Sequence, residues 1–186
     1  MTDETTDNPI VEPDETFRTI ATGVPGLDAV LGGGLPEYSF SMIAGAPGAG
    51  KTTLAQQIVF ANATVERPAL YFTVLGESTL KMLRYQRRFR FFRPELVGSG
   101  VRFINLSAEV LAQDLDQVLA RIVAEVEHYQ PRIVVVDSFR TINARRSGLP
   151  SADYERATTL EEFIHNLALQ LTTWEVTSFL IGEYNE

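Results

Sequence analysis

The feature that most constrains the fold of this chain is a glycine-rich octapeptide at residues 45–52, Gly-Ala-Pro-Gly-Ala-Gly-Lys-Thr. It fits the pattern G-x-x-x-x-G-K-[ST], in which the backbone N–H groups of a turn and of a helix N-terminus surround a phosphate chain. An apolar run at 40–44 precedes it, and a segment with helical apolar spacing at 52–63 follows it. The sequence therefore predicts a strand, a phosphate-binding loop and a helix in succession.

Each fixed position of this loop has a physical reason. Side chains at Gly48 and Gly50 would keep a phosphate away from the backbone N–H groups, and glycine tolerates the φ values of the turn. Lys51 supplies a positive charge to the β- and γ-phosphates of ATP, and the Thr52 hydroxyl is suited to bind Mg²⁺. The competing interpretation is a chance glycine-rich turn, which the flanking strand and helix argue against. The residues expected to contact the nucleotide are Gly45, Ala46, Pro47, Gly48, Ala49, Gly50, Lys51, Thr52 and Thr53.

Apolar segments along the rest of the chain alternate between strand-like and helix-like patterns. This alternation predicts an α/β protein, in which a mainly parallel sheet is flanked by helices on both sides. The expected strands are 40–44, 69–75, 101–106, 133–136 and 176–182, and the expected helices are 27–31, 52–63, 80–92, 110–129 and 153–174.

The run Ile-Val-Val-Val at 133–136 has no polar alternation, which is typical of a strand buried on both faces. Asp137 ends this strand, and the carboxyl ends of parallel strands face the ligand crevice. We therefore expect Asp137 to hold the water shell of Mg²⁺ opposite Thr52, as a Walker B residue does. The alternative is a carboxylate that only caps the next turn. Ser138 is either a partner of Asp137 or a local turn contact.

Hydrolysis of ATP also requires a group that orients water in line with the γ-phosphate. Glu77, just after the expected strand 69–75, is the first candidate for this catalytic carboxylate, acting together with Lys51. Glu183, after the last expected strand, is the second candidate. Either of them could instead be a solvated loop acid.

The composition excludes several other kinds of chemistry. The chain has no cysteine, so disulfides, thiolate catalysis and Cys-ligated zinc are excluded. With His128 and His165 as its two histidines, we do not expect a multi-histidine metal site. It has no run of about 18 uncharged apolar residues that could span a membrane, and no secretory signal at its start. The expected location is the cytoplasm.

The first sixteen residues differ in charge from the rest of the chain. The net charge is −8, yet residues 17–186 carry 18 acidic against 16 basic residues. We expect 1–16 to be a disordered acidic leader and 17–186 to be one folded domain, because the leader is acidic, rich in Thr and Pro, and free of bases. Its acids are Asp3, Glu4, Asp7, Glu12, Asp14 and Glu15.

Five motifs together resemble the KaiC-like branch of the RecA-type P-loop ATPases, from Phe17 to the end of the chain. The resemblance implies a RecA-type core, hydrolysis of Mg-ATP at subunit interfaces, and hexameric rings that often contain two tandem ATPase domains. It also implies regulatory protein partners, and self-phosphorylation in members of circadian clocks. The motifs are Thr-Gly-Val-Pro-Gly-Leu-Asp at 22–28, Gly-Gly-Leu-Pro at 33–36, the loop at 45–52, Tyr-Phe-Thr at 71–73 and Val-Val-Asp-Ser at 135–138.

The sequence departs from that family pattern in three places. Clock proteins carry a Glu-Glu pair where this chain has Leu75 and Gly76, and the carboxylate comes one residue later, at Glu77. Tyr38 stands where the family commonly has glycine. Family members continue beyond the position of Glu186 with strands that carry basic groups to a neighbour's γ-phosphate. We therefore expect a domain that is incomplete at its C-terminus, hydrolyses ATP slowly and assembles poorly by itself.

A basic segment at 81–93 contains three phenylalanines among its arginines. We favour a solvated helix face whose phenylalanines point to the core; the alternatives are contact with nucleic acid or with an acidic partner. Nucleic acid is therefore not an expected ligand. Arg145 and Arg146 are interpreted as a solvated loop pair, with a contact to a neighbouring subunit as the alternative. The basic residues of the segment are Lys81, Arg84, Arg87, Arg88, Arg90 and Arg93.

These features favour an ATPase that converts ATP and water to ADP and phosphate, with ATP and Mg²⁺ as ligands. Its hydrolysis would drive or report ring assembly in clock-like regulation. Two alternatives stay open: a slow or inactive ATP-dependent regulatory module with autokinase activity in the full-length protein, and a DNA-binding recombination or repair ATPase. A small-molecule P-loop kinase fits less well, because no acceptor-site or lid insertion is evident.

Overall fold

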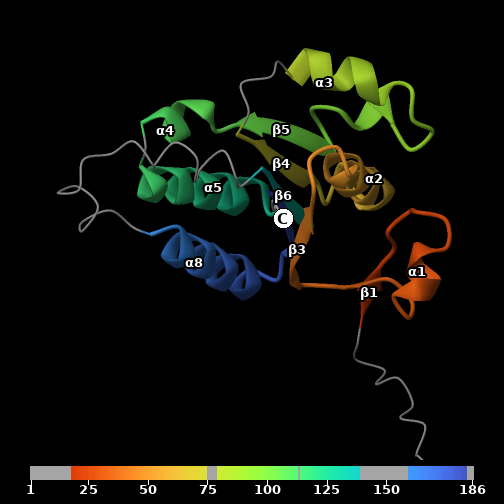
Figure 1. The fold of residues 1–186 in the computed structure, drawn as a ribbon, viewed down its shortest axis with the longest axis horizontal. Coiled ribbons are helices and arrows are strands. Elements are labelled where there is room, and N and C mark those ends of the chain that lie inside the picture. The colour runs from red at the N-terminus through yellow and green to blue at the C-terminus, as the bar shows by residue number, and fades with distance from the viewer. Residues whose placement is uncertain (1–17, 75–78, 113, 139–158, 184–186) are drawn as a thin grey trace, which may run out of the picture.

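A computed structural model describes residues 18–74, 79–112, 114–138 and 159–183. Its centre is a five-stranded sheet in the order β3-β7-β6-β4-β5, and every pair of neighbouring strands is parallel (Figure 1). The predicted α/β fold with a parallel sheet is therefore confirmed. The strands are β3 (Phe40–Gly45), β4 (Ala69–Thr73), β5 (Val101–Asn105), β6 (Ile133–Asp137) and β7 (Thr177–Glu183).

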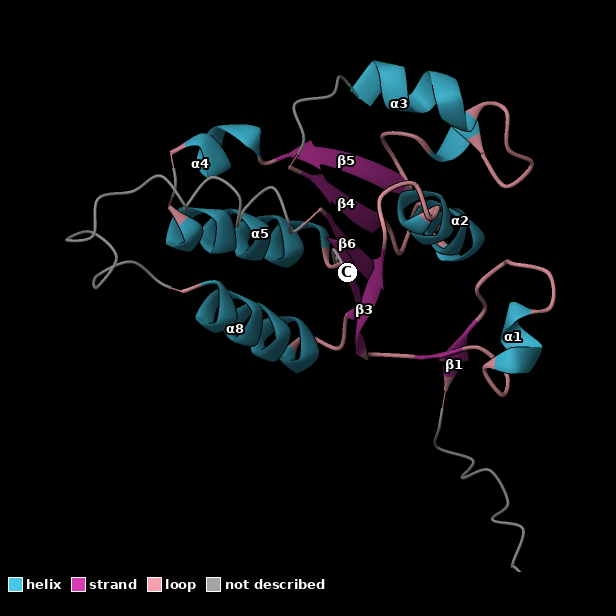
Figure 2. Ribbon diagram, viewed as in Figure 1, coloured by secondary structure: helices cyan, strands magenta, loops and turns pink. Residues whose placement is uncertain are grey.

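Helices cover both faces of this sheet, as Figure 2 shows. Helix α2 (Lys51–Asn62) lies over one face, and α5 (Leu115–Tyr129) and α8 (Leu160–Thr173) lie over the other. The short α4 (Ser107–Leu111) precedes α5, and α3 (Thr79–Gln86) lies beyond the β5 edge. None of the helices in the described part of the chain has both the length and the apolar character that a membrane crossing requires.

Strand β6 shows why its run of β-branched residues has no polar alternation. Successive side chains of a strand point to opposite faces. Ile133 and Val135 pack in the apolar cluster beneath α2, while Val134 and Val136 pack in the cluster beneath α5 and α8. Full burial of such a side chain contributes about 1.5–3 kcal/mol to stability. The same alternation turns Asp137 to the α2 side, which is the side of the glycine-rich loop.

The predicted helix 110–129 is wrong in its N-terminal part, because the structure has two helices there. Helix α4 ends at Leu111, and α5 begins at Leu115 after an N-cap at Asp114. The Asp114 carboxylate accepts a hydrogen bond from the backbone N–H of Gln117 (3.0 Å). An Asp at this position satisfies an N–H group that has no partner inside the helix, so it starts a new helix rather than continuing the old one.

The predicted helix 80–92 is also too long, since α3 ends at Gln86. Beyond it the chain turns so that Phe91 and Phe92 pack on Phe60 of α2, with ring centroids 6.3 and 5.2 Å apart. Tertiary packing of these two rings therefore takes precedence over the helical spacing. The last predicted helix, 153–174, is described from its capping box onward, where Thr159 and Glu162 cap α8; residues 153–158 lie outside the described part.

A small N-terminal unit was not predicted as a sheet. Strands β1 (Thr19–Ile20) and β2 (Leu35–Pro36) pair antiparallel, and α1 (Leu27–Val30) lies between them in the sequence. Asp28 accepts hydrogen bonds from the hydroxyl (2.6 Å) and the backbone N–H (2.8 Å) of Thr22. These two bonds lower the pKa of Asp28. The expected leader, 1–16, lies outside the described residues.

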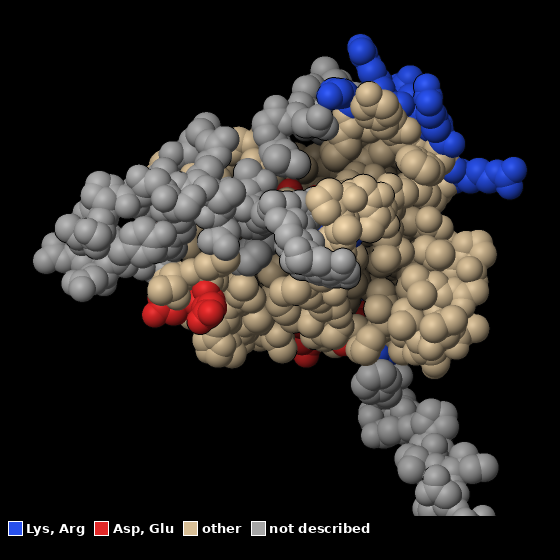
Figure 3. All heavy atoms as spheres, viewed as in Figure 1, with Lys and Arg blue, Asp and Glu red and all other residues tan. Residues whose placement is uncertain are grey.

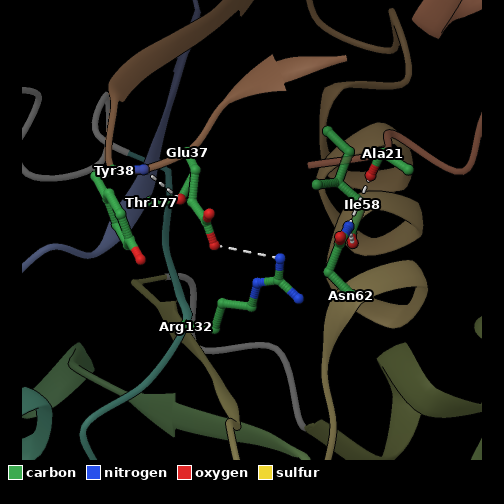
Figure 4. A network of polar contacts seen from close by, with 7 residues as sticks. All are labelled: Ala21, Glu37, Tyr38, Ile58, Asn62, Arg132 and Thr177. Atoms are coloured by element: carbon green, nitrogen blue, oxygen red, sulfur yellow. Dashed lines mark hydrogen bonds and ion pairs between the residues drawn. The ribbon is translucent and has the colours of Figure 1, made fainter. Parts of the chain in front are cut away.

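Helix α2 holds this unit through the side chain of Asn62. Its amide nitrogen donates to the carbonyl of Ala21 (2.7 Å) and to that of Ile58 on α2 itself (2.8 Å), as seen at the right of Figure 4. The N-terminal unit is therefore joined to the helix that follows the glycine-rich loop.

Candidate functional site

The glycine-rich loop connects the end of β3 to the start of α2. Gly45 is the last residue of β3, and Gly50 is the N-cap of α2. The φ angles of Gly48 and Gly50 are 78° and 86°, in the region that glycine adopts without strain. A Cβ atom at either position would meet no atom within 4 Å. The predicted succession of strand, loop and helix is therefore confirmed, and open space lies against the loop backbone.

A cavity of about 310 Å³ lies at this loop. It unites residues that are more than eighty positions apart in the sequence, because Asp137 and Ser138 face the loop across it. Ile181 of β7 completes the wall. The cavity thus combines the free N–H groups of a helix N-terminus with a carboxylate at a strand end, an arrangement suited to a phosphate chain and a hydrated cation.

Lys51 supplies the positive charge of this cavity. Its side chain is 8% exposed, and its Nζ donates to the carbonyl oxygens of Gly45 (2.9 Å) and Ala46 (2.8 Å). These bonds curl the lysine back over the loop that precedes it. Its ammonium group is therefore held beside the backbone turn, within the cavity wall.

Asp137 stands opposite Thr52, as expected from the sequence. The Thr52 hydroxyl donates to Oδ2 of Asp137 (2.8 Å), and Asp137 is 9% exposed. Oxygen ligands are the ones that Mg²⁺ prefers, and it usually takes one or two carboxylates plus substrate phosphates. In the described part of the chain no group of three or more His, Asp or Glu side chains could hold a metal. A hydroxyl beside a single carboxylate fits a Mg²⁺ that would be shared with phosphate.

Tyr71 of β4 is a site residue that the sequence reasoning missed. Its hydroxyl donates to the same Oδ2 of Asp137 (2.7 Å), and its ring is completely buried. Burial, with the negative charge of Asp137, raises the pKa of Tyr71 well above its ordinary value. The phenol therefore stays protonated and remains a donor. The strand pattern indicates part of this contact. Thr73 pairs with Asp137, and Tyr71, two residues before Thr73, lies on the same face of the sheet.

The two candidates for the catalytic carboxylate are only partly covered by the structure. Glu77 lies outside the described residues; its strand, β4, ends at Thr73, directly beside Asp137. The backbone of Glu183 ends β7 and pairs with Gly45, while nothing is described of its side chain. Both roles stay predictions. Arg145 and Arg146 also lie outside the described part.

The basic segment gathers on one side of the molecule, at the upper right of Figure 3. Arg93 has a structural role and is not counted with this surface, because its guanidinium donates to the backbone carbonyls of Phe60 and Ala63. Phe89 stacks on Phe91 with ring centroids 5.2 Å apart and is 43% exposed, and Tyr85 is 59% exposed. The interpretation that the phenylalanines face the core therefore holds for Phe91 and Phe92 but not fully for Phe89.

Four arginines of this segment are exposed and form no ion pair with any described residue. We call them, together with the exposed rings of Tyr85 and Phe89, the α3 surface. The four are Arg84, Arg87, Arg88 and Arg90.

The parallel sheet and the glycine-rich loop define a RecA-type P-loop domain. A family model described as "ATPase: KaiC" matches residues 20–186, and the chain therefore belongs to the KaiC family of ATPases. Its fold is similar to the crystal structure of a KaiC-like protein from Pyrococcus horikoshii, with a TM-score of 0.71, 24% identity, and coverage of 90% of this chain and 71% of that chain.

Two curated relatives match the same region. A DNA repair protein RadA of Mycobacterium tuberculosis is 37% identical over 128 residues, which are 68% of this chain and 23% of the relative. A UPF0273 protein of Thermotoga maritima is 27% identical over 140 residues, which are 68% of this chain and 57% of the relative. The chain thus spans less than two thirds of either relative.

Proposed function

We propose that this chain binds Mg-ATP in the cavity at the glycine-rich loop and hydrolyses its γ-phosphate. One observation carries the proposal: the Thr52 hydroxyl is bonded to Asp137 Oδ2 (2.8 Å) in the same cavity whose wall includes Lys51. These are the charges and oxygen ligands that a phosphate chain with its metal requires. The expected location remains the cytoplasm, as the sequence predicts.

In this proposal each residue has a separate task. The N–H groups of the loop and of the first turn of α2 hold phosphate oxygens, and the Lys51 ammonium leaves its two carbonyl partners for the β- and γ-phosphates. Thr52 and Asp137 would hold Mg²⁺ and its water shell. Bound there, Mg²⁺ would neutralise charge on the phosphate oxygens. Glu77 is assigned to orient the attacking water.

Tyr71 acts in this proposal as a positioning residue, because it touches Asp137 and not the phosphates. We expect Tyr71→Phe to raise the Mg²⁺ concentration for half-maximal turnover by about ten-fold or more, the usual effect of losing such an orienting partner. ATP binding without metal should change little. Turnover measured against Mg²⁺ tests this, with Tyr85→Phe as a control at an exposed phenol. Identical Mg²⁺ curves for parent and Tyr71→Phe would remove Tyr71 from the site.

We further propose that the whole protein assembles into hexameric rings in the presence of ATP, in clock-like regulation with protein partners. The support is membership of the KaiC family, in which ATP sites are expected at subunit interfaces. Light scattering of the whole protein with and without a non-hydrolysable ATP analogue tests the assembly. A molar mass that does not respond to the nucleotide would contradict it. A slow regulatory module with autokinase activity would instead retain ATP binding but release almost no phosphate.

A second candidate function is a nucleic-acid-dependent ATPase, and the α3 surface specifically favours it. Four arginines that have no ion pair among the described residues lie beside two exposed rings, and together they can hold phosphates and stack bases of a single strand. The relative from Mycobacterium tuberculosis is itself named a DNA repair protein.

Charge reversal tests this second candidate. If the α3 surface binds single-stranded DNA, Arg87→Glu with Arg88→Glu should weaken binding to oligo-dT by about ten-fold or more in 50 mM salt and flatten its salt dependence. The matched control, Arg18→Glu with Arg67→Glu, changes the same charge at two exposed positions outside the segment. Fluorescence anisotropy measures both. Equal losses in the two double variants would show only a general effect of net charge.

A further inference from the structure

A second cavity, of about 460 Å³, lies at the opposite ends of the strands from the phosphate loop. Its wall includes Tyr38, just before β3, and Arg67, just before β4. Glu127 and Gln130 enter from the end of α5, and Trp174 and Glu175 enter from the end of α8. The volume lies within the range of small-molecule sites. It is separate from the cavity at the glycine-rich loop and shares no wall residue with it.

The electrostatics of this cavity favour a cation. The C-termini of α5 and α8 both end at its wall, and each carries the partial negative charge of a helix C-terminus. The carboxylates of Glu127 and Glu175 add to it, against the single positive charge of Arg67. Nearby Arg132 adds no net charge, because one of its terminal nitrogens is paired with Glu37 (3.2 Å; Figure 4), although its Nε has no hydrogen-bond partner among the described residues.

Aromatic rings and uncommitted polar groups complete the wall. Tyr38 and Trp174 are half-buried, and their hydroxyl and indole N–H groups form no hydrogen bond within the described part of the chain. The carboxylates of Glu127 and Glu175 likewise have no partner among the residues that the structure covers. An aromatic face beside carboxylates is the recurrent environment of bound ammonium and guanidinium groups.

The backbone holds three of these side chains in an uncommon conformation. Among the described residues, Tyr38, Gln130 and Glu175 are the three non-glycine residues with positive φ (62°, 43° and 54°), and all three line this cavity. Glycine is usual at such positions at helix C-termini. The Tyr38 conformation is held by its backbone N–H, which donates to the Thr177 hydroxyl (2.9 Å; Figure 4). Residues in sparsely populated backbone conformations cluster at functional sites, so these three positions support the choice of this cavity as a candidate site.

We propose that this cavity binds an organic cation, an alkylammonium or guanidinium group with an apolar body. The source is either a free small molecule or a Lys or Arg side chain of another protein, since both present the same chemistry to the wall. The site shares no wall residue with the cavity at the glycine-rich loop, so the two sites can be tested separately.

Trp174 makes a direct test possible, because it is the one tryptophan of the chain and lies in the cavity wall. Titration with agmatine, spermidine or the blocked peptide acetyl-Gly-Arg-Gly-amide should change its fluorescence saturably, without nucleotide. Tighter binding of agmatine or spermidine indicates a free cation, and tighter binding of the peptide indicates a protein side chain. Either result supports the proposal. No saturable change with any probe, or tighter binding of the dianion glutarate, overturns it.

Two sets of variants should change agmatine affinity in opposite directions, which a folding defect would not do. Glu127→Gln with Glu175→Gln should weaken agmatine binding at least ten-fold, whereas Arg67→Gln should strengthen it. The control, Glu95→Gln with Glu161→Gln, removes the same charge at exposed positions outside the wall and should leave agmatine binding unchanged. ATP binding, measured in parallel, should be equal in all variants. A wrong assignment of the cation site can therefore be told apart from a wrong assignment of the ATP site. Equal agmatine affinities in parent and all variants would contradict the proposal.

Discussion

Lys51→Ala is expected to abolish ATP binding. The substitution removes the positive charge of the cavity wall, and each charge-assisted hydrogen bond to a phosphate contributes roughly 1.5–3 kcal/mol. Calorimetric titration with Mg-ATP should show at least about a hundred-fold loss of affinity.

A second variant distinguishes the effect of the Lys51 charge from the effect of its side-chain packing. Lys51→Met keeps much of the side-chain length without the ammonium group and should lose ATP binding to a similar degree. Lys81→Ala removes a lysine of α3 outside the cavity wall and serves as the control. Undiminished ATP binding in Lys51→Ala would mean that the phosphate site lies elsewhere in the molecule.

Glu77→Gln is expected to keep ATP binding and to reduce turnover by about a hundred-fold or more, the usual size of a general-base effect. The amide retains the shape of the carboxylate but can neither carry its charge nor accept a proton from water. The expectation has a structural basis in β4. The Tyr71 hydroxyl of this strand donates to Asp137, and the strand ends beside Asp137, so the chain leaves it next to this carboxylate.

Glu183→Gln is the matched comparison for Glu77→Gln. The backbone of Glu183 pairs with Gly45, so the chain leaves the sheet there beside the glycine-rich loop. Single-turnover release of phosphate, with ATP binding measured in parallel, decides between them. Turnover that falls only in Glu183→Gln would transfer the role to Glu183. Turnover that is equal to the parent in both variants would show that no catalytic base lies at either position.

The Tyr71 phenol shows how little of a buried polar contact can be read from a strand pattern. The alternation of side chains along β4 and β6 places Tyr71 and Asp137 on one face of the sheet. Whether the Tyr71 hydroxyl is close enough to bond to Asp137 depends on the order of the strands, which the whole sheet decides. Had β5 rather than β4 been the neighbour of β6, the hydroxyl would have been a full strand spacing further from Asp137, about 4.8 Å. The same holds for the cavity around Trp174, whose wall comes from four separate connections, those that lead into β3, β4, β6 and β7.

The sequence alone determined the features that depend on local chemistry. The loop at 45–52 requires glycine for its φ angles and a helix N-terminus for its anion, so its strand and helix could be predicted from neighbouring residues. The apolar run at 133–136 predicted a buried strand for the same kind of reason. The tertiary structure decided the early end of α3, the contact of Tyr71 with Asp137 and the cavity around Trp174. Each of these arises from packing between segments that are distant in the chain, and local propensity carries no information about such partners.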